Sequence, residues 1–392
     1  MSFSHGTWSF DSRDKTHTFA NDIESLENRR FDRFEPRDPL DPNDSNDSND
    51  PNYLSASDLD DFRRAALIHK VACKKALGCL YSGGKLAVLV DTVEHIINVL
   101  SKTHCDTGIA FPVGVNINNV VAHDSKTHLI PEHRVFCQGD VVKVDIGVHC
   151  NGRIIDSAFT HIVTDEPAVR SADSIYLPCL EASRDSMFTA IKMAGADQRL
   201  VEISETISEI IQSYEVSLGS NALPIKPIIG IGGHNIARYK VHGGKLVLSD
   251  PDPEIQGDQR MDENEVYAIE TYASTGYGVM TQNDSLDRCT HYMETPAVDV
   301  CANKAITKKD KKAFRKTDLY KWIESRGGLP FSSAWLVDVP KVARALKQAI
   351  PSGQITAYPP LYDEENSVVA QFEHTIHLKP NGVEIFSLDT DY

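Results

Sequence analysis

The stretch that decides the fold is VDIGVHCNGRIIDSAFT, Val144–Thr160. It holds two runs of apolar and β-branched residues on either side of Asn151-Gly152, a pair typical of a two-residue hairpin turn. We therefore predict two antiparallel strands joined at His149–Gly152. Positions whose numbers sum to about 301 should then lie opposite each other, which places Asp145 directly across from Asp156 on one face.

Two carboxylates in such an apolar hairpin repel each other and are costly to desolvate, so they need cations. Lysine or arginine partners could serve, but a divalent metal needs fewer groups and carboxylate oxygens suit it. Two more acids lie in similar runs, Glu270 in VYAIETYAS and Glu373 in QFEHTIHL, and His234 follows the glycines of GIGGHNI. Each of the three alone is compatible with a surface or turn residue. Together, four carboxylates and one imidazole have the composition of a two-metal hydrolytic site.

The residues around this set form two similar halves. Helical periodicity predicts one helix pair within residues 55–77 and 85–104, with Ser57 as the first N-cap, and a second pair within 174–193 and 197–211. A strand with glycine and histidine follows each pair, VGVNINNVVAH first and GIGGHNIARYKVH second. This pattern favours a pseudo-symmetric α/β fold with the site between the halves, although similarity this weak also arises by chance.

Charge is distributed unevenly along the 392 residues, whose net charge is −16. The first 60 residues carry 14 acids and 6 bases, and DPLDPNDSNDSNDPN cannot bury apolar area, so we predict an acidic low-complexity tail over residues 1–57. The tail could be an interaction arm or a solubilising segment. A chain this acidic is a poor candidate for general binding to nucleic acid or anionic membranes.

Cysteine usage and hydropathy bear on location. The eight cysteines form no CxxC pair, no run approaches a membrane span of about 20 apolar residues, and no secretory signal is recognisable. We therefore expect reduced thiols and a cytoplasmic protein.

Residues 294–356 differ from both halves. They contain helical segments and the basic run KKDKKAFRK, Lys308–Lys316, and we predict a small helical, winged-helix-like subdomain inserted into the larger domain. The basic run could contact RNA, but such runs are more often solvated helix faces. Before Glu270, the acidic segment LSDPDPEIQGDQRMDE is interpreted as the tip of a surface hairpin.

These segments resemble a known family. AFPVGVNINNVVAH, KVDIGVHCNGRIIDSAFT, GGHNIARYKVHGGK, VYAIETYASTG and YPPL with QFEHTIHL resemble, in this order, the motifs of type II methionine aminopeptidases of metallopeptidase family M24. The resemblance covers residues 58–392 and implies the pita-bread fold, two pseudo-equivalent α/β halves around a dinuclear metal centre. Type I enzymes have far fewer than the 102 residues between Glu270 and Glu373 here, so the resemblance identifies 294–356 as the insertion of the type II enzymes. The catalytic domain is then expected at 58–293 and 357–392.

The resemblance also implies residue roles. Asp145 would bind one of two divalent ions (Mn, Fe, Co or Zn), Asp156 and Glu373 would bridge both, and His234 and Glu270 would complete the other. A metal-activated hydroxide would attack the first peptide bond, with Glu270 as general base and with His123 and His242 binding the substrate amide or carbonyl. The methionine pocket would be lined by Phe111, Gly114, Val241, His291 and Tyr358.

The implied function is removal of the initiator methionine from nascent proteins with a small second residue. The implied partners are nascent N-termini and inhibitors of the fumagillin class at His123, for a protein that is a monomer and binds no membrane. Ribosome association stays open, because the tail lacks the Lys-rich blocks of larger relatives. Two rival functions use the same fold: a catalytically inactive scaffold that binds nucleic acid or protein, and a prolidase-like dipeptidase. The scaffold branch is expected to lose metal ligands, whereas all five are present here.

Overall fold

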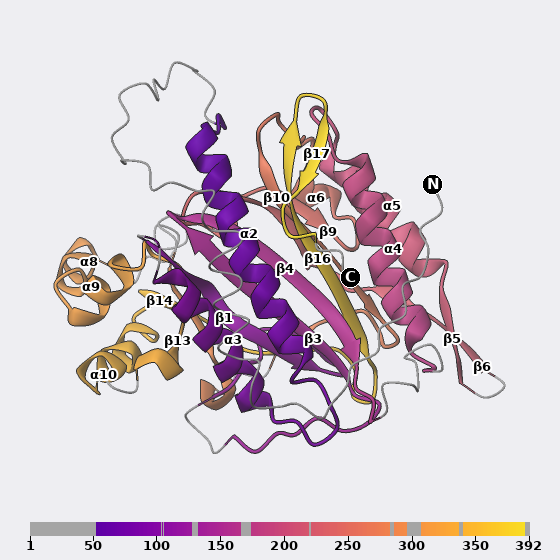
Figure 1. Ribbon diagram of the computed structural model, residues 1–392, viewed down its shortest axis with the longest axis horizontal. Coiled ribbons are helices and arrows are strands. Elements are labelled where there is room, and N and C mark those ends of the chain that lie inside the picture. Colours follow the sequence, from indigo (N-terminus) through magenta and orange to yellow (C-terminus); the bar gives the residue numbers. More distant parts are fainter. Residues whose placement is uncertain are drawn as a thin grey trace.

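The computed structural model describes residues 52–102, 104, 106–127, 132–165, 174–218, 221–282, 286–295, 307–336 and 340–388. The predicted acidic tail, 1–57, therefore lies almost wholly outside the described residues. Figure 1 shows the two main sheets lying against each other, with one helix pair packed on each. None of the helices in the described part of the chain is long and apolar enough to cross a membrane.

The first half consists of α2 (Ala56–Leu77) and α3 (Leu86–Ser101), which pack on a three-stranded sheet. The strand order of this sheet is β1 (Thr107–Ile117), β3 (Val141–Cys150) and β4 (Arg153–Ile162). Helix α2 begins after Ser55, so the prediction of Ser57 as its N-cap was wrong. Ser55 and Asp58 form a capping box, in which the Ser55 hydroxyl accepts the Asp58 N–H and the Asp58 carboxylate accepts the Ser55 N–H. Ser57 with Asp60 has the same spacing, but Asp58 also accepts a 2.8 Å hydrogen bond from Arg153 Nε on the sheet.

The predicted hairpin is present as β3 (Val141–Cys150) and β4 (Arg153–Ile162). Asn151 and Gly152 both have positive φ, 49° and 77°, as the twist of a tight hairpin requires. Because the loop has only two residues, Cys150 pairs with Arg153 and paired numbers sum to 303 rather than 301. The predicted direct opposition of the two aspartates was therefore wrong. Asp145 faces Ala158 and Asp156 faces Gly147, although a shift of two keeps both carboxylates on one face.

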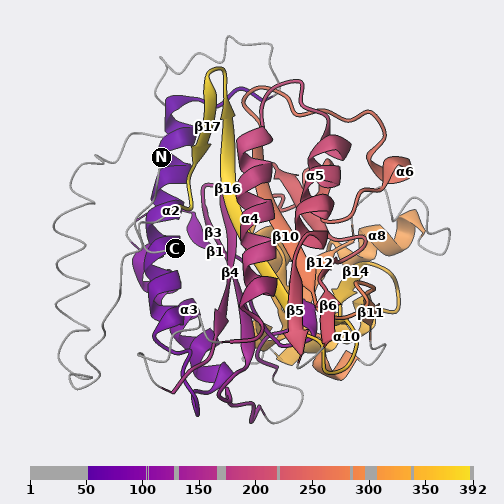
Figure 2. The same cartoon turned by 90° about the vertical axis from the view of Figure 1, so that its right-hand side faces the viewer.

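The second half repeats this arrangement. Helices α4 (Leu177–Met193) and α5 (Leu200–Gln212) run side by side over a second sheet, as Figure 2 shows. That sheet has the order β17-β16-β10-β8-β9, with β7 paired to β10. Its strands are β7 (Lys226–Pro227), β8 (Gly232–Ile236), β9 (Leu246–Leu248), β10 (Val266–Ser274), β16 (Val369–Lys379) and β17 (Gly382–Ile385).

Strand β1 completes the first sheet, and the remaining strands are short. Strand β2 (Val120–Ala122) pairs with β15 (Leu361–Tyr362), which pairs with β11 (Thr281–Gln282). Strand β12 (His291–Glu294) lies between β13 (Phe331–Ser332) and β14 (Ile355–Tyr358). A separate hairpin joins β5 (Glu215–Leu218) to β6 (Asn221–Pro224).

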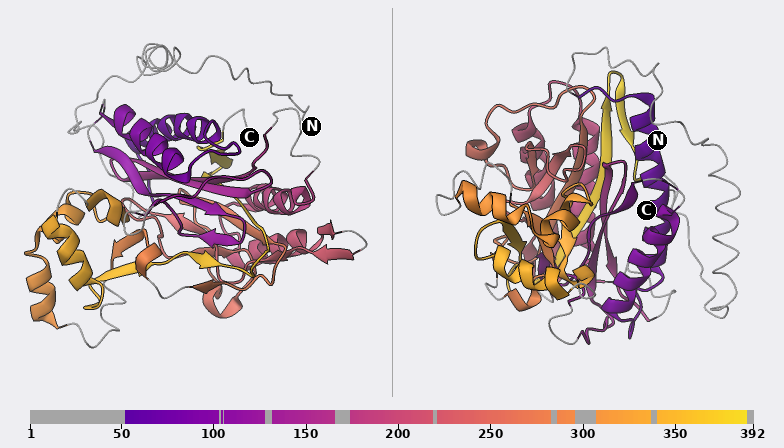
Figure 3. Two further views of the ribbon diagram at one scale, coloured as in Figure 1. Left: turned by 90° about the horizontal axis from the view of Figure 1, so that it is seen from below. Right: turned by 90° about the vertical axis from the view of Figure 1, so that its left-hand side faces the viewer.

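Helices α8 (Lys308–Phe314), α9 (Asp318–Glu324) and α10 (Pro340–Ala349) group at one side of the molecule (Figure 3). Their apolar side chains share a small core with Tyr292 and Ile355, separate from the cores under the two helix pairs. The boundaries predicted for an inserted subdomain, 294–356, stay a prediction.

The segment before β10 is more than the predicted hairpin tip. It contains a short helix, α6 (Pro253–Gln256), next to α5. The buried Gln256 amide donates hydrogen bonds to Ser204 Oγ and to the carbonyl of Leu246. This segment is thus anchored to the second half by a polar core contact that periodicity does not reveal.

Candidate metal centre

Three of the predicted ligands lie on one face of the second sheet. Glu270 on β10 pairs directly with Glu373 on β16, and Ala268, two residues before Glu270, pairs with His234 on β8. Since alternate residues of a strand share a face, His234, Glu270 and Glu373 point to the same side. The glycine before His234 is required there, because a Cβ on Gly233 would lie 2.5 Å from the carbonyl oxygen of Ala268.

The other two predicted ligands come from the first sheet, and hydroxyl groups bring that sheet against the second. Thr375 Oγ1 on β16 accepts the Asp156 N–H at 2.8 Å and donates to the Asp156 carbonyl at 2.6 Å. From β4, Ser157 Oγ donates to the Glu373 carbonyl at 2.6 Å. Thr160 Oγ1 donates to the Gln371 carbonyl at 2.6 Å and accepts the Gln371 N–H at 2.8 Å. These contacts replace a backbone ladder between β4 and β16, and they place Asp156 beside Glu373.

The five predicted ligands therefore meet between the two sheets. Possible ligand atoms of Asp156, His234 and Glu373, all buried, lie within 4.8 Å of one another, and His234 Nε2 is 3.7 Å from Asp156 Oδ2. Asp145 and Glu270 adjoin this group, since their charges raise the pKa of both Asp156 and Glu373.

Burial is the main cause of the pKa shifts in this group. It raises the pKa of Asp145 to about 7 and that of Glu270 to about 8, and it raises the pKa values of Asp156 and Glu373 well above normal. Repulsion among the four carboxylates adds to all of these shifts except that of Asp145. Among the described residues, no lysine or arginine contributes to them. Burial also lowers the pKa of His234 well below its usual value, which keeps the imidazole neutral and free to bind a cation.

The donor set fits divalent cations. Asp145 Oδ1, His234 Nδ1 and Glu373 Oε2 are buried without a hydrogen-bond partner, and such orphaned atoms are rare unless something else binds there. Four carboxylates that repel one another in a buried site are neutralised by about two divalent ions, and oxygen with one imidazole suits borderline metals.

Two further residues hold Glu270 and were not predicted. Tyr272 donates its hydroxyl to Glu270 Oε2 at 2.7 Å, and Gln371 donates Nε2 to the same oxygen at 3.0 Å. Tyr272 follows Glu270 by two positions and Gln371 precedes Glu373 by two, so both share the face of the acids. That period-two spacing was the signal in the sequence that could have revealed them.

The predicted substrate histidines lie beside this group. The ring of His242 lies against the ring of His234, with 3.9 Å between their centroids and an angle of 43° between their planes, and His242 is exposed. His123 follows β2 with a positive φ of 67°, and burial lowers its pKa to about 4. Its ring centroid lies 5.6 Å from that of Tyr358 and 5.7 Å from that of His291.

The predicted pocket residues lie in the same region. His291 pairs with Tyr358 across β12 and β14, and its Nε2 lies 3.2 Å from the carbonyl oxygen of Pro112, within the Phe111–Gly114 segment. Gly114 pairs with Asp145 across β1 and β3. The Phe111 ring lies over Gly147, and a Cβ added to Gly147 would lie 2.2 Å from that ring. Val241 is buried in the first core, directly before His242.

This geometry agrees with the comparisons with known proteins. The profile of metallopeptidase family M24 matches residues 60–295. The chain belongs to metallopeptidase family M24. Methionine aminopeptidase 2 of Komagataella phaffii is 37% identical over 338 residues, 85% of this chain and 70% of the relative. Methionine aminopeptidase 2 of Debaryomyces hansenii is 36% identical over 340 residues, 85% of this chain and 74% of the relative.

Solved structures with low sequence identity to this M24 chain share its fold. A thermophilic Arx1 superposes with a TM-score of 0.70 at 16% identity, covering 87% of this chain and 93% of that one. A methionine aminopeptidase from Thermotoga maritima superposes with a TM-score of 0.56 at 18% identity, covering 86% and 98%. The α/β pita-bread fold expected from the sequence is thereby confirmed.

Proposed function

We propose that this M24 chain is a methionine aminopeptidase that removes the initiator methionine from nascent proteins with a small second residue. The observation that carries the proposal is the meeting of the half-buried Asp145 with the buried Asp156, His234, Glu270 and Glu373, with orphaned ligand atoms on three of the five. The relatives named methionine aminopeptidase 2 support the choice of reaction.

Asp145, Asp156, His234, Glu270 and Glu373 would hold two divalent ions (Mn, Fe, Co or Zn). Such ions would supply Lewis-acid activation of water and of the scissile carbonyl. Glu270, oriented by Tyr272 and Gln371, would accept the proton of the attacking water as general base.

The two histidines beside the ligands would hold the substrate. His123 stays neutral at physiological pH because burial lowers its pKa to about 4, so its ring can donate a hydrogen bond to the substrate amide or carbonyl. His242, which is exposed and contacts the His234 ring, would stabilise the oxygen that gains charge.

Substrate and location complete the proposal. Phe111, Gly114, Val241, His291 and Tyr358 would enclose the methionine side chain, and fumagillin-class inhibitors would react at His123. The substrates are nascent N-termini, which places a monomeric enzyme in the cytoplasm. The lack of CxxC spacing is consistent with that compartment.

Turnover of short peptides tests this function. The purified, metal-loaded chain should release methionine from Met-Ala-Ser, should spare Met-Leu-Ser, and should lose the activity when Asp156 is replaced by asparagine. Cleavage of Ala-Pro in place of Met-Ala-Ser would favour the prolidase-like alternative. A folded, metal-binding chain that cleaves neither peptide would favour the inactive scaffold.

A further inference from the structure

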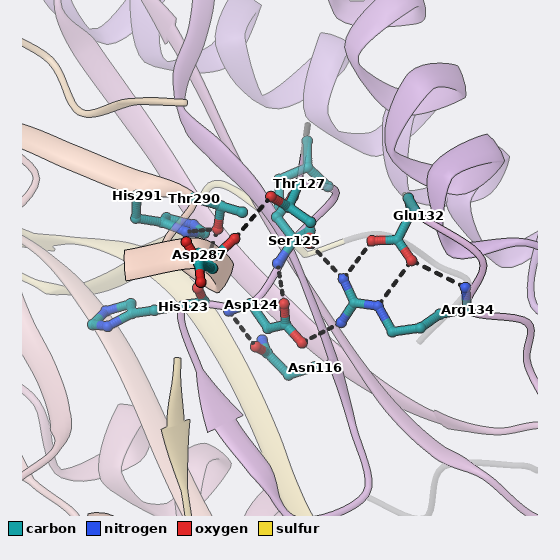
Figure 4. A network of polar contacts seen from close by, with 11 residues as sticks. Asn116, His123, Asp124, Ser125, Thr127, Glu132, Arg134, Asp287, Thr290 and His291 are labelled. Atoms are coloured by element: carbon teal, nitrogen blue, oxygen red, sulfur yellow. Dashed lines mark hydrogen bonds and ion pairs between the residues drawn. The ribbon is translucent and has the colours of Figure 1, made fainter. Parts of the chain in front are cut away.

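Behind His123 lies a buried polar network that the proposed mechanism does not use. Asp124, the next residue, is 2% exposed, and its carboxylate pairs with Nη1 of Arg134. Figure 4 shows the His123 ring and the Asp124 side chain pointing to opposite sides of the backbone, with Arg134 beyond Asp124. Neither Asp124 nor Arg134 lies among the predicted ligands or substrate residues.

The Arg134 guanidinium links three points of the segment that carries His123. Besides Asp124, its Nη2 donates to the Ser125 carbonyl at 2.7 Å, and its Nε and Nη2 donate to the two carboxylate oxygens of Glu132 at 3.0 and 2.7 Å. The Arg134 carbonyl in turn accepts the Leu86 N–H at the start of α3. Arg134 is therefore held at its backbone by α3 and at its guanidinium by Asp124, Ser125 and Glu132, because the planar guanidinium can donate to several acceptors at once.

Asp124 is held just as tightly on its backbone. Its N–H donates to Asn116 Oδ1 at 2.9 Å and its carbonyl accepts the Val115 N–H at 2.8 Å, both from β1. On the other side, Thr290 Oγ1 donates to the His123 carbonyl at 3.3 Å. The peptide group that follows the His123 Cα is thus held at both its carbonyl and its N–H, and β1 also holds the next carbonyl, that of Asp124.

His123 needs such support because its φ of 67° is a conformation that residues other than glycine rarely adopt. Such conformations persist only where the surroundings over-determine them. We propose that Asp124 and Arg134 are positioning residues that hold the His123 ring beside Tyr358 and His291, facing the substrate. This inference rests on the proposed function for the role of His123, but the position of the ring can be measured without turnover.

Kinetics in a double-mutant cycle give the first test. In metal-loaded protein, Asp124→Asn should lower kcat for Met-Ala-Ser by about tenfold to a hundredfold with little change in KM, the loss expected when a supporting contact is removed. In a His123→Ala background the same change should have almost no further effect on kcat. A merely structural role would lower kcat equally in both backgrounds.

Acylation of His123 gives the second test, which needs no activity. Diethyl pyrocarbonate should modify His123 several-fold faster in Asp124→Asn than in the wild-type chain, measured by mass spectrometry against His242 in the same molecule. Asp58→Asn, which breaks the matched Asp58–Arg153 pair away from His123, should leave this ratio unchanged. Where Asp124→Asn does not fold, Arg134→Lys replaces it, because lysine keeps the charge but loses the fork.

An unchanged acylation ratio in Asp124→Asn or Arg134→Lys overturns the positioning role, as does an equal loss of kcat in both backgrounds. If the wild-type chain releases no methionine while the acylation ratio still rises, the proposed function fails and the positioning of His123 stands.

Discussion

Thr375→Val should separate the two sheets at the metal centre. The Thr375 hydroxyl is fully buried and serves both backbone groups of Asp156, accepting its N–H at 2.8 Å and donating to its carbonyl at 2.6 Å. Valine has nearly the shape of threonine but offers neither function. The variant therefore leaves the N–H and carbonyl of a predicted metal ligand without partners.

The expected loss follows from these two groups. A buried donor or acceptor left unsatisfied costs about 1–3 kcal/mol, so the two together should lower the free energy of unfolding by about 2–6 kcal/mol. Thr375→Ser keeps the hydroxyl and removes one methyl group, which should cost only about 1 kcal/mol.

Urea denaturation of the two variants in the presence of chelator measures this difference without any contribution from bound metal. Isothermal titration with Mn²⁺ should in addition show weaker binding to Thr375→Val than to Thr375→Ser. If valine proves as stable as serine at this position, the hydroxyl contacts do not join the sheets and our account of how Asp156 is placed is wrong.

Three further changes have definite expected outcomes. Without metal, folded Asp145 and Glu270 keep their protons up to about pH 7 and 8 whereas the unfolded chain ionises near pH 4, so their contribution to stability falls as pH rises between these values. The free energy of unfolding of the wild-type chain, relative to that of the double variant Asp145→Asn/Glu270→Gln, should thus fall by about 2 kcal/mol from pH 6.5 to 8. Urea titrations with chelator measure this difference, and a difference that does not change with pH would contradict the raised pKa values of the two carboxyl groups. Tyr272→Phe removes a hydrogen bond to Glu270 and should lower kcat/KM about tenfold in peptide assays. Tyr267→Phe, on the same strand, removes a matched hydrogen bond to Glu265 and should leave kcat/KM unchanged, so equal losses in the two variants would contradict the role of Tyr272. Gly147→Ala places a Cβ 2.2 Å from the Phe111 ring and should cost about 1–3 kcal/mol in thermal unfolding and raise KM, whereas Gly195→Ala, with nothing within 4 Å, should do neither.

Much of the architecture could be predicted because it depends on local patterns. Asn151-Gly152 between two apolar runs determines the hairpin, and helical periodicity locates both helix pairs. The acids stood out because Asp145, Asp156, Glu270 and Glu373 interrupt strands that are otherwise apolar. That this set binds divalent metal was predicted from its composition, whereas the role of each residue was predicted only through the resemblance to family M24.

The errors and omissions concern the exact position of one turn and contacts that only tertiary placement decides. The predicted hairpin register was wrong by two because the turn is centred on Asn151-Gly152, one residue later than a sum of 301 implies, which changes the partners of Asp145 and Asp156. Ser55 rather than Ser57 caps α2 because Asp58 is also bound by Arg153, 95 residues later. The Thr375 contacts and the Asp124–Arg134 pair depend on tertiary placement and leave no period in the sequence.

The most direct test of the central claim is Met-Ala-Ser hydrolysis by chelator-stripped protein during titration with Mn²⁺. The account predicts no methionine release at the start and a rate that rises until about two equivalents per chain are bound, the number that four carboxylates can neutralise. Full activity in protein verified to be free of metal would contradict it. So would a chain that binds the two ions and still releases no methionine.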